Sequence, residues 1–397
     1  MSSRHVGFFV LFMLACADVV SVPIAGGNFR LFYLAALLGL AFTLRTLRMN
    51  GELVLRFAVL VACLVPSIVF GIDPSRSLLY LAWVVLTFVC TFGLFGQLTP
   101  APPSAARGLD REALYDALVQ IYRVQIVVAL ALYAVGVHER PQFLYYEPSY
   151  FSISLALYCA FVAHRLRKGR GVMFDVFLIA AYLLTSASGA FVLVLSLTAL
   201  LNVSLRRLTY VISGAVLAIA ASATYFYSVD DVNTALVRSV LSGDVDAYEI
   251  LLRGGNRLAR MLAARDLFID NPGRGIGLGN FELATKIFDV DNFAENQDWL
   301  SNEGKPAINI YLEILATTGL IGFLGFCIFF LPLFRWMFGA GYASPLSRGV
   351  ICMLLLLTWE SNFLRPYLWV GMTLCWIEYR QAILALREPA RRLARRA

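Results

Sequence analysis

The feature that most constrains this chain is a series of long apolar segments separated by short polar ones. A helix needs about 20 apolar residues to cross the hydrocarbon core of a bilayer, and roughly twelve segments approach that length. We therefore expect an all-α polytopic membrane protein with about twelve transmembrane helices. The first segment lacks a small-residue cleavage site, so we expect it to be retained. The segments are 6–24, 29–44, 53–70, 78–98, 113–137, 148–164, 172–187, 189–205, 208–227, 306–333, 349–364 and 367–386.

Composition excludes the other common classes. Of 397 residues, 59% are hydrophobic and 15% are charged, whereas soluble domains have roughly 45–50% apolar and about 25% charged residues. A single soluble core does not explain the excess, because such cores stop growing near about 250–300 residues. The seven cysteines all lie in apolar segments, without the spacing of a disulfide framework or a zinc site. We expect neither a metal nor a cofactor.

The basic residues predict the orientation of the chain. With the N-terminus in the cytoplasm, the inner short segments carry 18 Arg or Lys, and the outer short loops carry only Arg30, Arg76, Arg140 and Arg365. Both termini are therefore expected in the cytoplasm. We expect the basic tail 387–397 to contact membrane lipids. Because the charge is scattered between apolar segments, we expect no nucleic acid.

One long polar segment, residues 228–305, separates the first nine expected helices (1–227) from the last three (306–386). Loops of this length are usually functional or disordered. Apolar residues recur at helical spacing over 256–269, with Asn256 as a possible cap and Asn271-Pro272 as the end. We therefore expect a structured loop on the outer side that contains one helix.

This loop contains an unusual group of arginines. Arg253, Arg257 and Arg260 are spaced i, i+4, i+7, and Arg265 and Arg274 follow. On a helix the first three share a face, where like charges repel. One interpretation is a solvated face whose charges pair with the acidic residues Glu249, Asp266 and Asp270. The other is a diphosphate site, because the guanidinium group binds phosphate oxygens bidentately and keeps its charge.

A glycine-rich stretch follows directly, with Gly275, Gly277 and Gly279 alternating before Asn280 and Phe281. It matches neither the dinucleotide-binding fingerprint nor the P-loop. Alternating glycines allow backbone to approach a partner closely and expose N–H groups. The pattern is compatible with a tight irregular loop or with a substrate contact through Gly277, Gly279 and Asn280.

A second outer-face motif is Tyr145-Tyr146-Glu147-Pro148-Ser149. Glu followed by Pro is typical of a helix start. The functional interpretation places the Glu147 carboxylate at the membrane surface as a general base, beside the rings of Tyr145 and Tyr146, which could stack on sugars.

The third motif is Asn309-Ile310-Tyr311-Leu312-Glu313, followed by Gly319-Leu320-Ile321-Gly322. Asn309 and Glu313 share one helix face, and a carboxylate at membrane depth should face the bundle interior. Most other intramembrane charges are expected to form buried structural pairs, for example Glu360 with Arg365.

Taken in order, Arg257, Asn271-Pro272, the glycine-rich stretch, Asn309–Glu313 and Gly319–Gly322 resemble the O-antigen ligase and polymerase superfamily. Glu147-Pro148-Ser149 resembles the polymerase branch. The ligase branch has a His where this chain has Ile308, and its Ser-Arg-Ser-Gly pattern is Ser186-Ala187-Ser188-Gly189 here. The resemblance therefore favours a Wzy-type polymerase of lipid-linked glycans.

This resemblance implies a glycosyltransferase of the bacterial inner membrane that polymerises undecaprenyl-diphosphate-linked oligosaccharide repeat units on the periplasmic face, for O-antigen or a related surface polysaccharide. It implies inversion at the anomeric centre and a chain-length regulator as partner. Under this hypothesis Arg257 stabilises the leaving diphosphate and Glu147 activates the acceptor hydroxyl. An O-antigen ligase, with His138 as a possible base, and a lipid-linked oligosaccharide flippase remain the alternatives. The expected substrate-binding residues are Arg253, Arg260, Arg265, Arg274, Gly277, Gly279, Asn280, Tyr145, Tyr146, Asn309, Tyr311 and Glu313.

Overall fold

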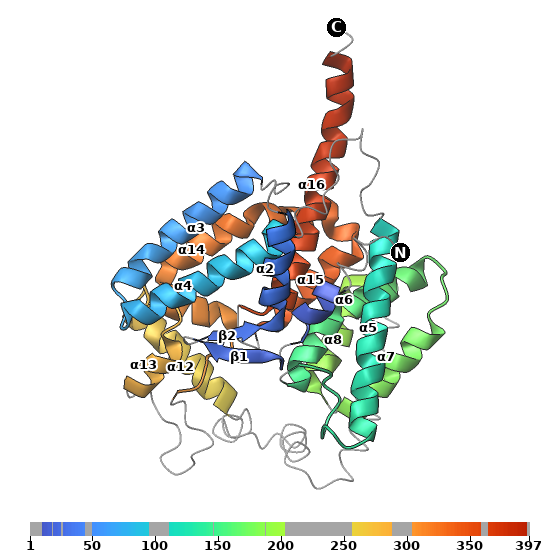
Figure 1. Cartoon of the computed structure of the whole chain (residues 1–397), viewed down its shortest axis with the longest axis horizontal. Coiled ribbons are helices and arrows are strands. Elements are labelled where there is room, and N and C mark those ends of the chain that lie inside the picture. The colour runs from blue at the N-terminus through green and yellow to red at the C-terminus, as the bar shows by residue number, and fades with distance from the viewer. Residues whose placement is uncertain are drawn as a thin grey trace, which may run out of the picture.

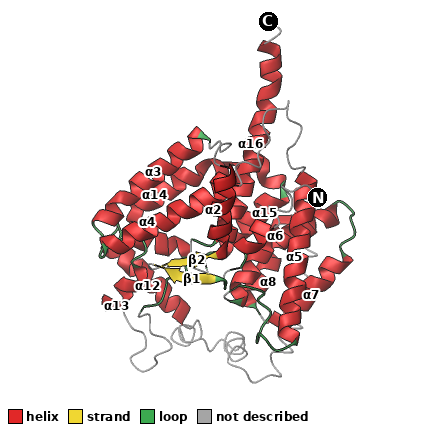
Figure 2. Cartoon of the chain, in the orientation of Figure 1, coloured by secondary structure: helices red, strands yellow, loops and turns green. Residues whose placement is uncertain are grey.

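The computed structural model describes residues 10–17, 19–24, 27–43, 50–94, 111–145, 147–186, 188–202, 256–287, 304–358 and 364–394. Within these residues the chain is helical apart from one short hairpin and the connecting loops (Figures 1 and 2). The helices are α2 (Leu31–Thr43), α3 (Gly51–Val69), α4 (Pro74–Phe88), the π-helical η2 (Val89–Gly93), α5 (Arg111–Ala134), α6 (Pro148–Arg167), α7 (Met173–Ser186), α8 (Gly189–Asn202), α12 (Asn256–Asp270), α13 (Phe281–Ile287), α14 (Ile310–Phe338), the 3-10 helix η5 (Ala340–Ala343), α15 (Pro345–Leu356) and α16 (Pro366–Ala394).

Four helical stretches are long and apolar enough to cross a membrane, judged by length and composition. They are Gly51–Val69, Pro74–Gly93, Leu114–Ala134 and Ile310–Phe338. Shorter apolar helices occupy Leu31–Ala41, Met173–Ser186, Gly189–Asn202 and Pro345–Leu356. This supports the predicted all-α membrane protein. The expected span 208–227 and much of the loop 228–305 lie outside the described residues, so the count of twelve stays a prediction.

The sequence-based expectation of a helix over residues 6–24 is wrong at its C-terminal end. Residues 10–15 are helical, but Ser21–Ile24 forms strand β1, which pairs antiparallel with β2 (Gly27–Arg30) in the register Ser21↔Arg30. The physical reason is local. β-Branched residues dominate Val19–Ile24 and favour extended backbone, and Pro23 cannot donate a helical hydrogen bond.

The two ends of the helix bundle differ. The hairpin β1–β2, α12 and α13 lie at one end, which we call the hairpin end (Figure 1). The C-terminal part of α16 projects beyond the other helices at the opposite end, which we call the tail end. In the orientation expected from the basic residues, the hairpin end faces outward.

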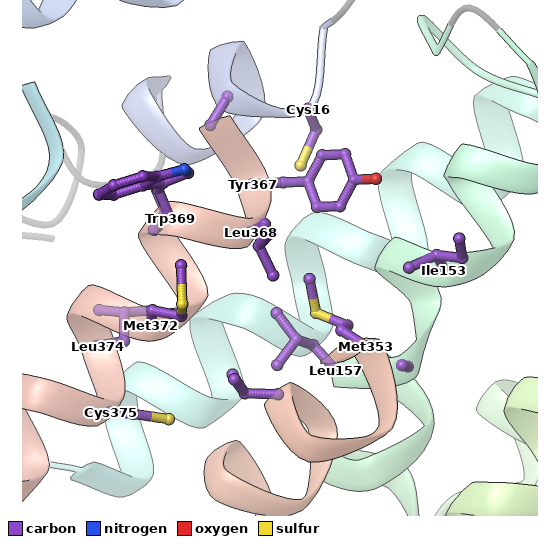
Figure 3. Packing of buried hydrophobic residues seen from close by; sticks show 14 of the residues in the cluster. Cys16, Ile153, Leu157, Met353, Tyr367, Leu368, Trp369, Met372, Leu374 and Cys375 are labelled. Carbon is purple, nitrogen blue, oxygen red and sulfur yellow. The ribbon is translucent and has the colours of Figure 1, made fainter. Parts of the chain in front are cut away.

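Helix α6 lies in the centre of the bundle. The twelve consecutive residues Phe151–Val162 are all buried, so this helix is surrounded by protein on every side. It packs mainly against α8 and α15. Figure 3 shows side chains from α6, α15 and α16 gathered in this core, among them Leu157, Met353 and Leu368.

An ion pair lies inside the bundle, as predicted for most intramembrane charges. Asp175 of α7 is fully buried. Arg123 of α5 donates to it from Nε at 2.6 Å and from Nη2 at 2.8 Å, and the Tyr158 hydroxyl of α6 donates at 2.8 Å. The bidentate geometry joins three helices. The specific pair expected between Glu360 and Arg365 is untested, because Glu360 lies outside the described residues.

Candidate functional site at the hairpin end

The glycine-rich loop is seated in a break of helix α14. At Gly319 the backbone leaves helical geometry, with φ 64° and ψ −172°, which frees carbonyl and N–H groups on both sides of the break. Ile276 N donates to Ala316 O at 2.9 Å and Gly277 N to Thr317 O at 2.9 Å. In the other direction Leu320 N donates to Pro272 O at 2.8 Å. The loop therefore satisfies backbone groups that the break exposes.

The glycine-rich loop also packs closely against the turn between α3 and α4. Gly277 has a φ of 110°, and a Cβ there would lie 2.9 Å from Gly71 Cα. Asn280 is fully buried, and its Nδ2 donates to Asp73 O and to Ser77 Oγ, both at 3.2 Å. The close approach predicted for the glycines is thus an approach to protein backbone. Asn280 joins the glycine-rich loop to the start of α4 by hydrogen bonds. Their expected contact with a glycan stays a prediction.

Gly279 sits at the edge of this arrangement. Its carbonyl accepts a hydrogen bond from Arg76 Nε at 2.9 Å, and Arg76 Nη2 pairs with Glu282 of α13 at 3.0 Å. The ring of Tyr80 lies where a Gly279 side chain would be. Arg76, in the first turn of α4, therefore holds α13 against this helix.

The arginines of α12 do not form a single described cluster. Arg253 lies outside the described residues, and Arg257 lies on the first turn of α12, where only the backbone is described. Arg260 Nη1 donates to Pro306 O at 3.0 Å, and Arg265 pairs with the adjacent Asp266 at 2.7 Å. The solvated, carboxylate-paired interpretation therefore fits Arg265.

Arg274 is exposed in the loop that follows α12, and its guanidinium carbon lies 5.1 Å from the ring centroid of Phe70. This cation–π contact keeps the charge at the surface of the hairpin end. For Arg257, Arg260 and Arg274, the role in binding diphosphate stays a prediction.

Glu147 begins α6, as its sequence predicts. It occupies the N-cap position, its carboxylate is exposed and does not cap the helix, and Ser149 Oγ donates to Oε2 at 3.2 Å. The carboxylate thus faces outward from the helix start.

The rings expected beside Glu147 are placed differently from the prediction. Tyr145 is fully buried, stacks on Phe151 at 5.0 Å and meets the edge of Tyr367 at 5.8 Å. Because core neighbours enclose this ring, neither of its faces is exposed, and its expected stacking on a sugar stays a prediction. Tyr146 lies outside the described residues.

The Asn309–Glu313 motif forms the start of α14. Asn309 Oδ1 accepts from Tyr311 N at 2.9 Å and from Leu312 N at 3.1 Å, which makes it an N-cap. The Tyr311 hydroxyl donates to Leu354 O at 2.7 Å and so joins α14 to α15. Glu313 is half-buried one turn further on. The described partners of Asn309 and Tyr311 are structural, and their glycan-binding roles stay predictions.

Two arginines that the sequence placed in outer loops are buried at this end. Arg30, at the end of β2, is 4% exposed and donates from Nη1 to Leu364 O at 3.2 Å. The neighbouring Arg365 is 6% exposed, with its guanidinium carbon 3.5 Å from the ring centroid of Tyr150. Tyr150 follows Glu147 by one helical turn, so Arg30, Arg365 and Glu147 belong to one contiguous region. The sequence feature that could have indicated this burial is a single Arg in a very short loop between two apolar segments.

The hairpin end therefore combines buried guanidinium groups, an outward carboxylate and a loop fastened into a broken helix. Such a set can hold an anion and accept a proton. Among the described residues, no three potential metal ligands converge.

Residues 172–327 match the O-antigen ligase family, Wzy_C. The matched stretch includes α7, α8, α12, the glycine-rich loop, α13 and the first half of α14 with its break. It confirms the predicted resemblance to the O-antigen ligase and polymerase superfamily, and it points to a membrane glycosyltransferase-like enzyme of the ligase or polymerase type. No curated protein matches the chain.

Proposed function

We propose that this protein is an inner-membrane glycosyltransferase that polymerises undecaprenyl-diphosphate-linked oligosaccharide repeat units into O-antigen or a related surface polysaccharide. The observation that supports this most is the burial of Arg30 and Arg365 in the same region as Glu147. A guanidinium group keeps its positive charge and binds phosphate oxygens bidentately, so two such groups at the end of a membrane bundle favour a site for an anionic ligand.

The diphosphate of the lipid-linked donor is that anion in our proposal. Guanidinium groups form charge-assisted hydrogen bonds worth about 1.5–3 kcal/mol each. Their attraction to phosphate strengthens where surrounding protein lowers the dielectric. Arg30 and Arg365 approach the diphosphate from the bundle, and Arg257 approaches it from α12. The undecaprenyl chain extends into the lipid beside the helices.

The proposed reaction is a displacement at the anomeric carbon of the donor. Glu147 accepts the proton of the acceptor hydroxyl, whose oxygen forms the new glycosidic bond. The bond from the anomeric carbon to the diphosphate oxygen breaks, and undecaprenyl diphosphate leaves with the electron pair. The arginines stabilise the growing negative charge on that leaving group, as preorganised donors do at other transition states. In-line attack inverts the anomeric centre.

The direct test is synthesis of longer glycans by the purified protein supplied with lipid-linked repeat units. We expect Arg257→Ala and Glu147→Gln to abolish chain growth, and Arg140→Ala to leave it unchanged. Arg140 is a suitable control because it is an exposed arginine predicted on the outer side to which the proposal gives no role. Full-length glycan from Arg257→Ala or Glu147→Gln would refute the proposed roles.

The same assay separates the alternatives. A ligase would attach the glycan to a lipid A core acceptor, and a flippase would produce no longer chain. The buried Ile308, which precedes the N-cap Asn309, occupies the position where the ligase branch carries a His. This difference favours the polymerase, because an aliphatic side chain cannot exchange a proton.

A further inference from the structure

A second polar site lies at the tail end, away from the region described above. A cavity of about 310 Å³ opens between the first turns of α3, the last turns of α14 and the middle of α16. Its walls include two cations, two apolar residues and two large aromatic rings. These are Arg56 and Arg335, Leu331 and Pro332, and Trp336 and Tyr379.

The two cations are held differently. Arg56 is anchored by Glu52, with Nε 3.1 Å from Oε1, and by a hydrogen bond from Nη1 to Ile328 O at 3.2 Å. Arg335 is exposed and, within the described part of the chain, makes no ion pair with a carboxylate. Since Glu52 offsets only one of the two positive charges, the cavity keeps a net positive charge and favours an anion.

The aromatic residues place the cavity at the boundary of the bilayer. Trp336 and Tyr379 have ring centroids 6.0 Å apart, and Trp336 lies in the last turn of the apolar stretch Ile310–Phe338. Trp and Tyr are enriched where helices leave the hydrocarbon region. The ring of Trp336 lines the cavity, while its indole Nε1 is buried without an acceptor among the described residues.

Apolar surface continues from the cavity toward the centre of the helices. Val59 is 36% exposed, Leu331 is 46% exposed and Ile328 is 43% exposed. These side chains flank the two arginines in sequence, on helices long enough to cross a bilayer. A ligand that fits both surfaces has an anionic head and hydrocarbon chains.

We propose that this cavity binds the phosphate group of an anionic phospholipid, whose acyl chains lie on the exposed surface of α3 and α14. Basic pockets between transmembrane helices bind such head groups in general. The guanidinium groups of Arg56 and Arg335 hold the phosphate oxygens, and the rings of Trp336 and Tyr379 border the glycerol region. This inference does not depend on the proposed glycan chemistry.

The test compares full-length protein in nanodiscs of phosphatidylcholine with and without phosphatidylglycerol, by native mass spectrometry and thermal unfolding. We expect a retained phosphatidylglycerol adduct and a raised Tm for the wild type. Arg56→Gln combined with Arg335→Gln should weaken phosphatidylglycerol binding about 25-fold, since each arginine near an anionic lipid contributes roughly a factor of five. The double Arg→Lys variant should retain most of the binding.

The matched control is Arg380→Gln, which removes a cation next to Tyr379 that does not line the cavity. It should bind phosphatidylglycerol like the wild type. Equal binding by the double Gln variant, equal binding of phosphatidylcholine, or the same Tm rise from inorganic phosphate alone would overturn the proposal. If the double Gln variant does not fold, the Lys variant decides: failure of the folded Lys variant to bind phosphatidylglycerol would also overturn it.

Discussion

Replacing Gly319 by Ala tests the seating of the glycine-rich loop in the break of α14. At φ 64° and ψ −172° a side chain strains the backbone by about 1–3 kcal/mol. The new Cβ would also lie 2.3 Å from Gly273 O, so the loop must withdraw.

The energetic cost of Gly319→Ala follows from the hydrogen bonds that break when the loop withdraws. Leu320 N donates to Pro272 O at 2.8 Å and Ile321 N to Gly273 O at 3.2 Å, and each backbone hydrogen bond contributes about 0.5–1.5 kcal/mol. Adding the backbone strain gives a total cost of about 2–6 kcal/mol for the closed loop.

The assay is amide hydrogen exchange of the purified protein, which reports local opening. The amides of Ile276 and Gly277 donate to carbonyls of α14, so their exchange should accelerate at least about 30-fold, the factor that corresponds to 2 kcal/mol. Gly51→Ala is the matched control, because a Cβ at Gly51 meets nothing within 4 Å. Unchanged protection of both amides in Gly319→Ala would refute this account of the loop.

Two further predictions concern charged groups elsewhere in the bundle. Asp175→Ala leaves Arg123 and Tyr158 without their buried carboxylate and should destabilise the protein by about 3–5 kcal/mol. The expected result is a lower Tm in detergent. A Tm equal to that of the wild type would show that the ion pair contributes little. At the tail end, the hydrogen bond from Lys168, helped by neighbouring cations, lowers the pKa of Glu112. Because the folded pKa is depressed, this stabilisation is present at neutral pH and disappears as pH falls from about 4.3 through the folded pKa. Glu112→Gln should therefore have a lower Tm than wild type at pH 7 and an equal Tm at strongly acidic pH; a gap that persists in acid would contradict the assignment.

Hydropathy alone predicted most helix positions, because membrane insertion depends on a local property of the chain. The expected spans 53–70 and 148–164 correspond closely to α3 and α6. The strand Ser21–Ile24 was missed because Val22 and Ile24 continue the apolar run of the preceding helix. The β-branched residues, Pro23 and the glycines that follow distinguish it.

The candidate site was predicted less completely, because its partners are distant in sequence. The glycines indicated a close backbone approach, but nothing local to Gly277 identified the break at Gly319 as the partner. Likewise, Arg30 and Leu364 are 334 residues apart. Burial of Arg30 depends on contacts that only the assembled bundle provides, so its place in the sequence did not predict it.

The enclosed position of α6 has a consequence for how the protein is made. Its mean hydropathy is low for a membrane helix, and its neighbour α15 is synthesised some way after it, beginning at Pro345. Until α15 emerges from the ribosome, the face of α6 that packs against α15 can contact only lipid or the insertion machinery. During biogenesis the central helix α6 therefore stays partly unpacked until α15, near the C-terminus, is synthesised. Truncation before Pro345 should expose α6 to quality-control proteases.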